Sequence, residues 1–136
     1  MTPSEIVILS ATVLINFVLV GFVYVRNPRH ATHRLFAVQT IIINLYLVTN
    51  FIAVNATTER LALWSIRFVM FFGAPLATVC FFCMHAFPGA RMTLTRKAQG
   101  IWIALALIAM AASLSPFLFV TVNLVESGVP QPVAGP

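Results

Sequence analysis

Four long apolar stretches, separated by short polar connectors, run along this chain. They cover residues 6–25, 35–54, 61–87 and 98–122. A helix of about 20 residues, rising about 1.5 Å per residue, spans the roughly 30 Å hydrocarbon core of a bilayer. We therefore predict an all-α membrane protein with four transmembrane helices packed as a helix bundle. We expect a single membrane domain, residues 1–136, with an outer C-terminal tail at 123–136.

Local signals place the ends of these helices. Residues 2–5 (TPSE) combine a cap hydroxyl, a proline at the first helical position and a glutamate three residues after the cap, which favours a helix start. Asn27-Pro28 ends the first stretch and Pro88-Gly89 ends the third. No basic region or small-residue cleavage site accompanies the first stretch, so we expect a retained helix rather than a signal peptide.

The composition favours a membrane location. Of the 136 residues, 60% are hydrophobic and 8% are charged, and the mean hydropathy is +0.98. One small water-soluble core cannot bury that much apolar surface. The net charge of +5 is spread thinly, without the basic helix face that nucleic-acid binders show. We expect no nucleic-acid partner; the expected partners are the lipid bilayer and other membrane helices or subunits.

The basic residues predict the orientation, because Lys and Arg in short loops stay on the cytoplasmic side. The connectors after the first and third stretches hold three basic residues each, whereas the segments on the opposite side hold only Arg60. The three acidic residues, Glu5, Glu59 and Glu126, all fall on that opposite side. We therefore predict that both termini lie outside. The six connector residues are Arg26, Arg29, Arg34, Arg91, Arg96 and Lys97.

One permanent charge, Arg67, falls inside a predicted span, about two turns into the third helix. A charge within lipid is costly and by default suggests a function. In the structural interpretation, Arg67 reaches the outer interface or pairs with Glu5, Glu59 or Glu126 at that level. In the functional interpretation, it contacts an anionic ligand or a partner. The structural interpretation is favoured.

Polar side chains of the second helix form another candidate set. At about 100° per residue, Gln39, Tyr46 and Asn50 fall within about 40° of one another. Asn44 lies to one side, and Asn16 lies midway along the first helix. We expect such side chains to face protein, where interhelical hydrogen bonds are favoured over a polar ligand cavity. Gln39, Tyr46 and Asn50 join Arg67 as candidate ligand or partner contacts.

No cofactor, metal or catalytic site is expected. His85 is the only histidine within a span, and His30 and His33 belong to the first connector, so opposed haem-ligating histidines are not favoured. Cys80 and Cys83 lie in an apolar stretch, where a disulfide framework or a two-ligand zinc site is implausible. No Ser/His/Asp or Cys/His triad, phosphate loop or pair of membrane carboxylates can be assembled, so we expect no enzyme.

Three segments carry a resemblance to a known family. They are RNPRHATHRLFAVQT after the first helix, ERLALWSIRFVMFFGAPLATVCFFCMHAFPG across the third, and SPFLFVTVNLVESGVPQPVAGP at the end of the chain. In this order they resemble the N-terminal seven-helix membrane sensor region of bacterial histidine kinases, a region that also precedes other signalling output domains. The likeness covers essentially the whole chain and includes no catalytic signature.

The resemblance implies seven helices and an output domain after the last one, whereas this sequence reaches Pro136 after four. It implies a location in the bacterial inner membrane. The expected function is the membrane-sensing portion of a bacterial signal-transduction receptor, without its output domain. The alternative is a small accessory or structural subunit packed within a larger bacterial membrane complex.

The predicted orientation is testable by cysteine accessibility. A cysteine introduced near Arg29 or Thr93 should react with a membrane-impermeant reagent only from the cytoplasm, because both connectors are rich in basic residues. A cysteine near Thr58 or Val129 should react only from outside. Labelling at Thr58 from the cytoplasm would overturn the orientation.

Overall fold

A computed structural model describes residues 3–27, 30–87, 93–116, 118–124 and 130–134. Within them the chain forms four helices and a two-stranded hairpin. All four helices are long and apolar enough to cross a membrane, as predicted. The chain therefore has the build of a multi-pass membrane protein. The elements are α1 (Pro3–Arg26), α2 (Ala31–Val54), α3 (Glu59–Ala86), α4 (Arg96–Leu114), β1 (Phe119–Leu124) and β2 (Pro130–Ala134).

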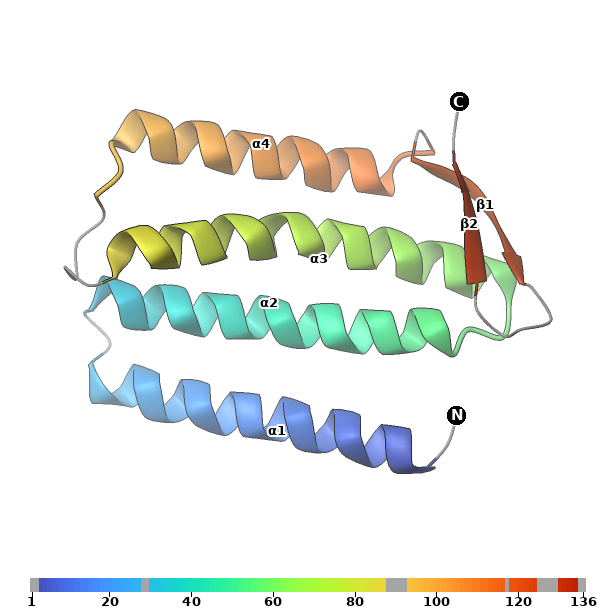
Figure 1. Cartoon of the computed structure of the whole chain (residues 1–136), viewed down its shortest axis with the longest axis horizontal. Coiled ribbons are helices and arrows are strands. Elements are labelled where there is room, and N and C mark those ends of the chain that lie inside the picture. The colour runs from blue at the N-terminus through green and yellow to red at the C-terminus, as the bar shows by residue number, and fades with distance from the viewer. Residues whose placement is uncertain (1–2, 28–29, 88–92, 117, 125–129, 135–136) are drawn as a thin grey trace.

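The helices lie side by side in one antiparallel layer, in the order of the sequence (Figure 1). Packing joins α1 to α2, α2 to α3 and α3 to α4. Because α1 and α4 occupy opposite edges, the layer does not close on itself as the predicted bundle would. The hairpin lies at the end of the layer where α1 and α3 begin.

Helix α3 is the centre of this arrangement, since it packs against α2, α4 and both strands. Small residues allow the closest approach: Ala62 and Ala86 of α3 are fully covered, and Ala53 of α2 is buried. Small side chains let membrane helices come near enough for backbone and side chains to interlock. Helix α1, at the edge, has no buried residue among those described.

Large apolar side chains point outward instead of filling a core. Phe22 and Val25 of α1 are 69% and 79% exposed, and Ile108 of α4 is 65% exposed. In water so much exposed apolar surface would be unfavourable, whereas lipid chains are as apolar as these side chains. The described part of the layer therefore carries large apolar side chains on its surface, as helices that span a membrane do.

All four helices begin before the apolar stretches that predict them. Helix α2 begins at Ala31, not at about Leu35, so Thr32, His33 and Arg34 form its first turn. The prediction of a connector through Arg34 was wrong, because loss of hydrophobicity marks the edge of the membrane and not the end of a helix. Helices α3 and α4 begin at capping threonines, Thr58 and Thr95, each of which accepts a backbone N–H bond.

The predicted extent of the fourth helix, to residue 122, was also wrong. Helix α4 ends at Leu114, and Ser115 takes an extended conformation with ψ of 157°. The next residue is Pro116, whose ring disfavours helical geometry in the residue before it. The β-branched residues 120–122 then belong to β1, as β-branched side chains favour strands.

Strands β1 and β2 pair antiparallel, with Thr121 opposite Val133 and Leu124 opposite Pro130. The predicted outer tail at 123–136 therefore contains strand structure that its Pro/Gly-rich composition did not indicate. Three charges used to predict the orientation, Arg29, Arg91 and Glu126, lie outside the described residues.

Candidate functional site

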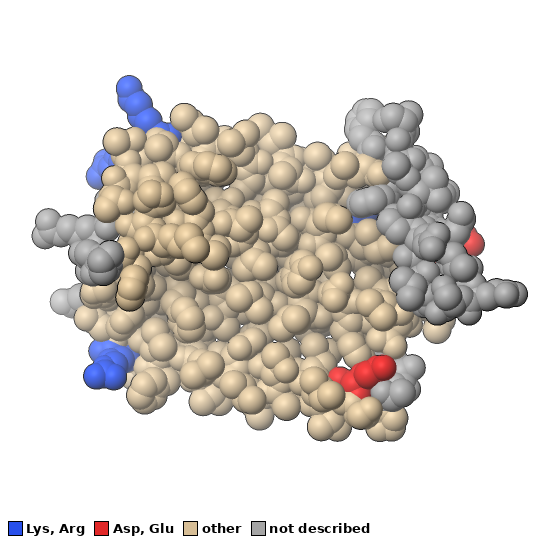
Figure 2. Space-filling view, in the orientation of Figure 1, with Lys and Arg blue, Asp and Glu red and all other residues tan. Residues whose placement is uncertain are grey.

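The two ends of the helix layer differ in charge. Basic side chains gather at the end opposite the hairpin, and acidic ones lie at the hairpin end (Figure 2). Arg26 ends α1, Arg34 lies in the first turn of α2, and Arg96 and Lys97 begin α4. The antiparallel order brings these residues to one end, which we call the basic end. Glu5 and Glu59, in the first turns of α1 and α3, lie at the hairpin end.

Arg67 lies within the protein and not on its lipid-facing surface. Its side chain is only 9% exposed, and its guanidinium carbon lies 5.3 Å from the centre of the Trp64 ring. A guanidinium this close to an aromatic face gains a cation–π attraction. Ser65, two residues earlier on α3 and on another face of it, is also buried. One contact of the guanidinium therefore comes from its own helix, in the half of α3 that lies nearer the hairpin.

The three candidates on α2 do not form one site. Gln39 and Tyr46 are half-buried, whereas Asn50 is exposed. Gln39 lines a groove at the basic end, and Asn50 lines a different groove nearer the hairpin end. Asn50 is exposed although α1 forms the other wall of its groove, so that it faces protein stays a prediction; Gln39, Tyr46 and Asn50 do share a helix face.

The buried polar contact of α2 involves Asn44 instead. The Asn16 side-chain amide of α1 donates to Asn44 Oδ1 at 2.8 Å. Asn44 is 5% exposed, and its Nδ2 has no hydrogen-bond partner among the described residues. Asn16 stands midway along α1, so this bond links α1 and α2 inside the apolar part of both helices.

The exposure pattern of α1 shows how it meets α2. Its half-buried positions recur every three or four residues: Leu9, Val13, Asn16, Val20 and Val23. This is the spacing of a helix that packs along one narrow seam. A single polar residue in such a seam fixes the register of the two helices. Asn16 holds that central position, which indicates that the Asn16–Asn44 bond sets the alignment of α1 on α2.

Histidine and threonine side chains tie the helix ends together at the basic end. His33 Nδ1 lies 3.1 Å from the Asn27 carbonyl, and the Thr32 hydroxyl donates to the Ala86 carbonyl at 3.5 Å. His85 Nδ1 lies 3.0 Å from the Thr93 hydroxyl, which donates to the His85 carbonyl. These bonds close the α1–α2 turn, join α2 to α3 and hold Thr93, which precedes α4, against the end of α3.

Several grooves of about 410 to 480 Å³ open on the described part of the layer, and two of them are lined by candidate residues of α2. The basic-end groove, of about 480 Å³, lies among α1, α2 and α3 and is lined by Val23, Thr32, His33, Phe36, Gln39, Cys83, Met84 and Phe87. The hairpin-end groove, of about 410 Å³, lies between α1 and α2 and is lined by Glu5, Ile8, Leu9, Thr12, Leu47, Asn50, Phe51, Val54 and Asn55. Both have mainly apolar walls with a few polar groups.

Within the described residues, no three His, Cys, Asp or Glu side chains come close enough together to hold a metal ion. Cys80 and Cys83 are free thiols on α3. His30 and His33 have ring centres 5.0 Å apart in the α1–α2 turn. His85 packs instead against Phe81, whose ring also contacts Trp102 of α4.

Comparison with known proteins leaves the candidate residues to be interpreted from geometry alone. No family model, curated protein or solved structure matches the chain. The likeness to the sensor region of histidine kinases therefore stays a prediction.

The sequence interpretation missed His33 and Thr32 as groove residues because it placed them in a loop. The signal that would have found them is the absence of a helix breaker between His30 and Leu35. Polar residues alone do not end a helix, and residues 31–34 include neither Pro nor Gly.

The Asn16–Asn44 bond predicts a measurable coupling between α1 and α2. In a double-mutant cycle with Asn16→Ala and Asn44→Ala, the free energies of unfolding in mixed detergent should show a coupling of about 0.6 kcal/mol, with about 1.7 kcal/mol as an upper bound. Asn50→Ala is the matched control, since Asn50 is exposed, and it should change stability little. A coupling of zero between Asn16 and Asn44 would show that the bond does not stabilise the protein.

A substitution of Arg67 distinguishes a structural role within the fold from a role in binding an anion. If it serves the fold, Arg67→Lys should be mild, because lysine keeps the charge and can also lie over the Trp64 ring. We expect this variant to keep normal membrane levels and partner binding. Loss of partner binding or signalling at normal membrane levels would instead indicate bidentate recognition of a carboxylate or phosphate, which lysine cannot reproduce.

Proposed function

We propose that this chain is the membrane-sensing part of a bacterial signal-transduction receptor. It is located in the inner membrane, with the first turns of α1 and α3 on the outer side. The observation that carries the proposal is the position of α3. This one helix contacts the hairpin at one end and both neighbouring helices along its length. At the basic end, its His85 contacts Thr93, just before α4.

Such a helix suits signal transmission. A stimulus that moves the hairpin or the first turns of α3 displaces one rigid element, because a helix carries its own backbone hydrogen bonds. The opposite end of that element is then displaced relative to α2 and α4. A ligand acts in this way only if it binds one packing arrangement better than another. Output is carried by other domains or subunits that meet the basic end.

The scarcity of buried residues supports such two-arrangement behaviour. Apart from small side chains, the described residues buried along α3 are Arg67 and Phe82. Few interlocking large side chains oppose a shift of α3 past its neighbours, since dense packing is what makes interiors resist displacement.

The alternative function, an accessory subunit of a larger membrane complex, is favoured by α1. No described residue of α1 is buried, and its apolar side chains cover the outer edge of the layer. Such an edge offers a ready packing surface for the helices of another subunit. The two functions differ in one expectation. In a receptor, a structural change at the hairpin end alters the structure of the basic end, whereas an accessory subunit does not require this.

The proposal is tested by measuring that coupling directly. Spin labels at Arg26 and Lys97, both exposed at the basic end, report the distance between the outer edges of α1 and α4 by pulsed electron resonance. Thr121→Pro, which removes a backbone N–H from the β1–β2 ladder, should shift or broaden this distance distribution in lipid nanodiscs. The matched control is Leu14→Ala on the exposed edge of α1, which should leave it unchanged.

An unchanged distribution in Thr121→Pro would contradict transmission through α3. Gentle purification of the tagged chain from its native membranes then separates the two functions. A signalling protein with a kinase or another output domain in stoichiometric amount would support the receptor. A stoichiometric complex without any signalling component would support the accessory subunit.

A further inference from the structure

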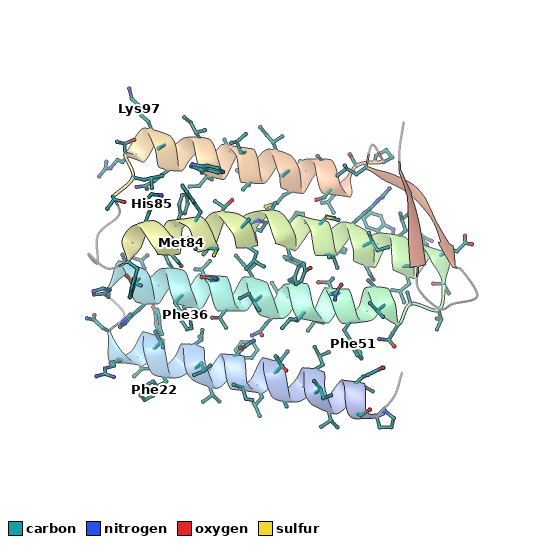
Figure 3. All side chains as sticks on the ribbon, in the orientation of Figure 1. Phe22, Phe36, Phe51, Met84, His85 and Lys97 are labelled. Atoms are coloured by element: carbon teal, nitrogen blue, oxygen red, sulfur yellow. The ribbon has the colours of Figure 1, made fainter. Side chains whose placement is uncertain are left out.

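The basic-end groove has the shape and wall chemistry of a site for a hydrocarbon chain. Its apolar walls come from three helices: Val23 of α1, Phe36 of α2, and Met84 and Phe87 at the end of α3. Met84 and Phe87 are each 71% exposed, so they are not covered by other parts of the protein. Phe36 and Met84 lie toward the same end of the layer as His85 and Lys97 (Figure 3). A groove of about 480 Å³ with such walls accommodates a segment of one acyl chain.

Polar groups lie in the same groove on the first turn of α2. They are Thr32 and His33, with Gln39 two turns further along. His33 Nδ1 is directed to the Asn27 carbonyl, so it is the donor nitrogen of that contact, and no described residue forms a hydrogen bond with Nε2. An imidazolium donates hydrogen bonds from both of its ring nitrogens.

The surrounding charge is positive. Arg26, Arg34, Arg96 and Lys97 lie at this end of the layer, and the acidic Glu5 and Glu59 lie at the other (Figure 2). Basic residues at a membrane surface attract anionic lipid, by about fivefold in binding for each residue. At the basic end, an anionic headgroup therefore gains an electrostatic attraction that a zwitterionic headgroup, with no net charge, does not gain.

The hairpin-end groove supplies an internal comparison. It is nearly as large, about 410 Å³, and its walls are also mainly apolar. Among the described residues, Glu5 is the charged residue that lines it, whereas His33 lines the basic-end groove and the Lys and Arg side chains of that end lie around it. If apolar shape alone selected a lipid, both grooves would bind the same lipids, whereas charge would make only the basic-end groove selective.

We propose that the basic-end groove binds an anionic phospholipid, with one acyl chain against Phe36 and Met84 and the phosphate beside His33. A lipid seated there contacts α1, α2 and α3 together, and it would stabilise their packing at the basic end. This inference goes beyond the proposed function and does not depend on it, since a receptor or a subunit would hold such a lipid equally well.

Lipid titration followed by native mass spectrometry tests the site. Delipidated full-length protein in mild detergent is titrated with phosphatidylglycerol or with phosphatidylcholine of the same chains. The wild type should bind the first phosphatidylglycerol several-fold more tightly than phosphatidylcholine. His33→Ala should weaken phosphatidylglycerol binding about fivefold, the effect of one lost hydrogen bond to the phosphate, and should weaken binding of phosphatidylcholine, which carries the same phosphate, by a similar factor.

Two matched controls separate the groove from general effects. Arg60→Gln removes one positive charge at the hairpin end, and it should leave phosphatidylglycerol binding within twofold of wild type. Cys83→Phe fills the basic-end groove and should abolish the tight binding, whereas Leu47→Phe fills the hairpin-end groove and should not.

Three results would overturn the proposal. They are equal affinity for the two lipids, an effect of Arg60→Gln as large as that of His33→Ala, and tight binding that survives Cys83→Phe. Circular dichroism of each variant shows whether it is folded. If His33→Ala is unfolded, the pair Cys83→Phe and Leu47→Phe decides the matter alone.

Discussion

Hydrocarbon as a solvent is the constraint on which the rest of this structure depends. A bilayer core offers no hydrogen-bond partner to a peptide group, so each spanning segment must satisfy its own backbone as a helix. Apolar side chains then gain nothing by meeting one another instead of lipid. The layer of α1 to α4 follows from both facts, because it needs only narrow seams between neighbours and tolerates large apolar side chains on its faces.

Under this constraint, the few polar and small residues within the spans decide how the helices align. Ala62 and Ala86 let α3 approach its neighbours closely. Asn16 and Asn44 place one directed bond in the seam between α1 and α2. An apolar seam alone tolerates sliding by a turn, whereas a hydrogen bond between two amides exists in one register only. A few contacts therefore specify how each helix is aligned with its neighbours in the layer.

The number and approximate place of the helices could be predicted from the sequence, because the thickness of the hydrocarbon core sets the length and the hydropathy of each spanning segment. Helix ends were less predictable. Helix α2 begins at Ala31, before its apolar stretch, and α4 ends before Pro116, inside the fourth apolar stretch. The hairpin was missed because its β-branched residues were counted with the apolar run before them.

The candidate residues show where a helical wheel stops being informative. The wheel correctly grouped Gln39, Tyr46 and Asn50 on one face, but position along the axis separates Gln39 and Asn50 into different grooves. It set Asn44 aside, although Asn44 makes the bond to α1. Which face of a helix meets a neighbour depends on the neighbour's position, and that is a property of the assembled layer.

The open layer also explains why charge, and not shape, can distinguish its grooves. Grooves between neighbouring helices arise wherever a bulky side chain such as Phe36 stands beside a seam, so mainly apolar grooves occur at both ends. Their charge surroundings differ because the antiparallel order gathers Arg26, Arg34 and Lys97 at one end and Glu5 and Glu59 at the other. The residues that orient a membrane protein through its basic loops thus also set the charge that surrounds its grooves.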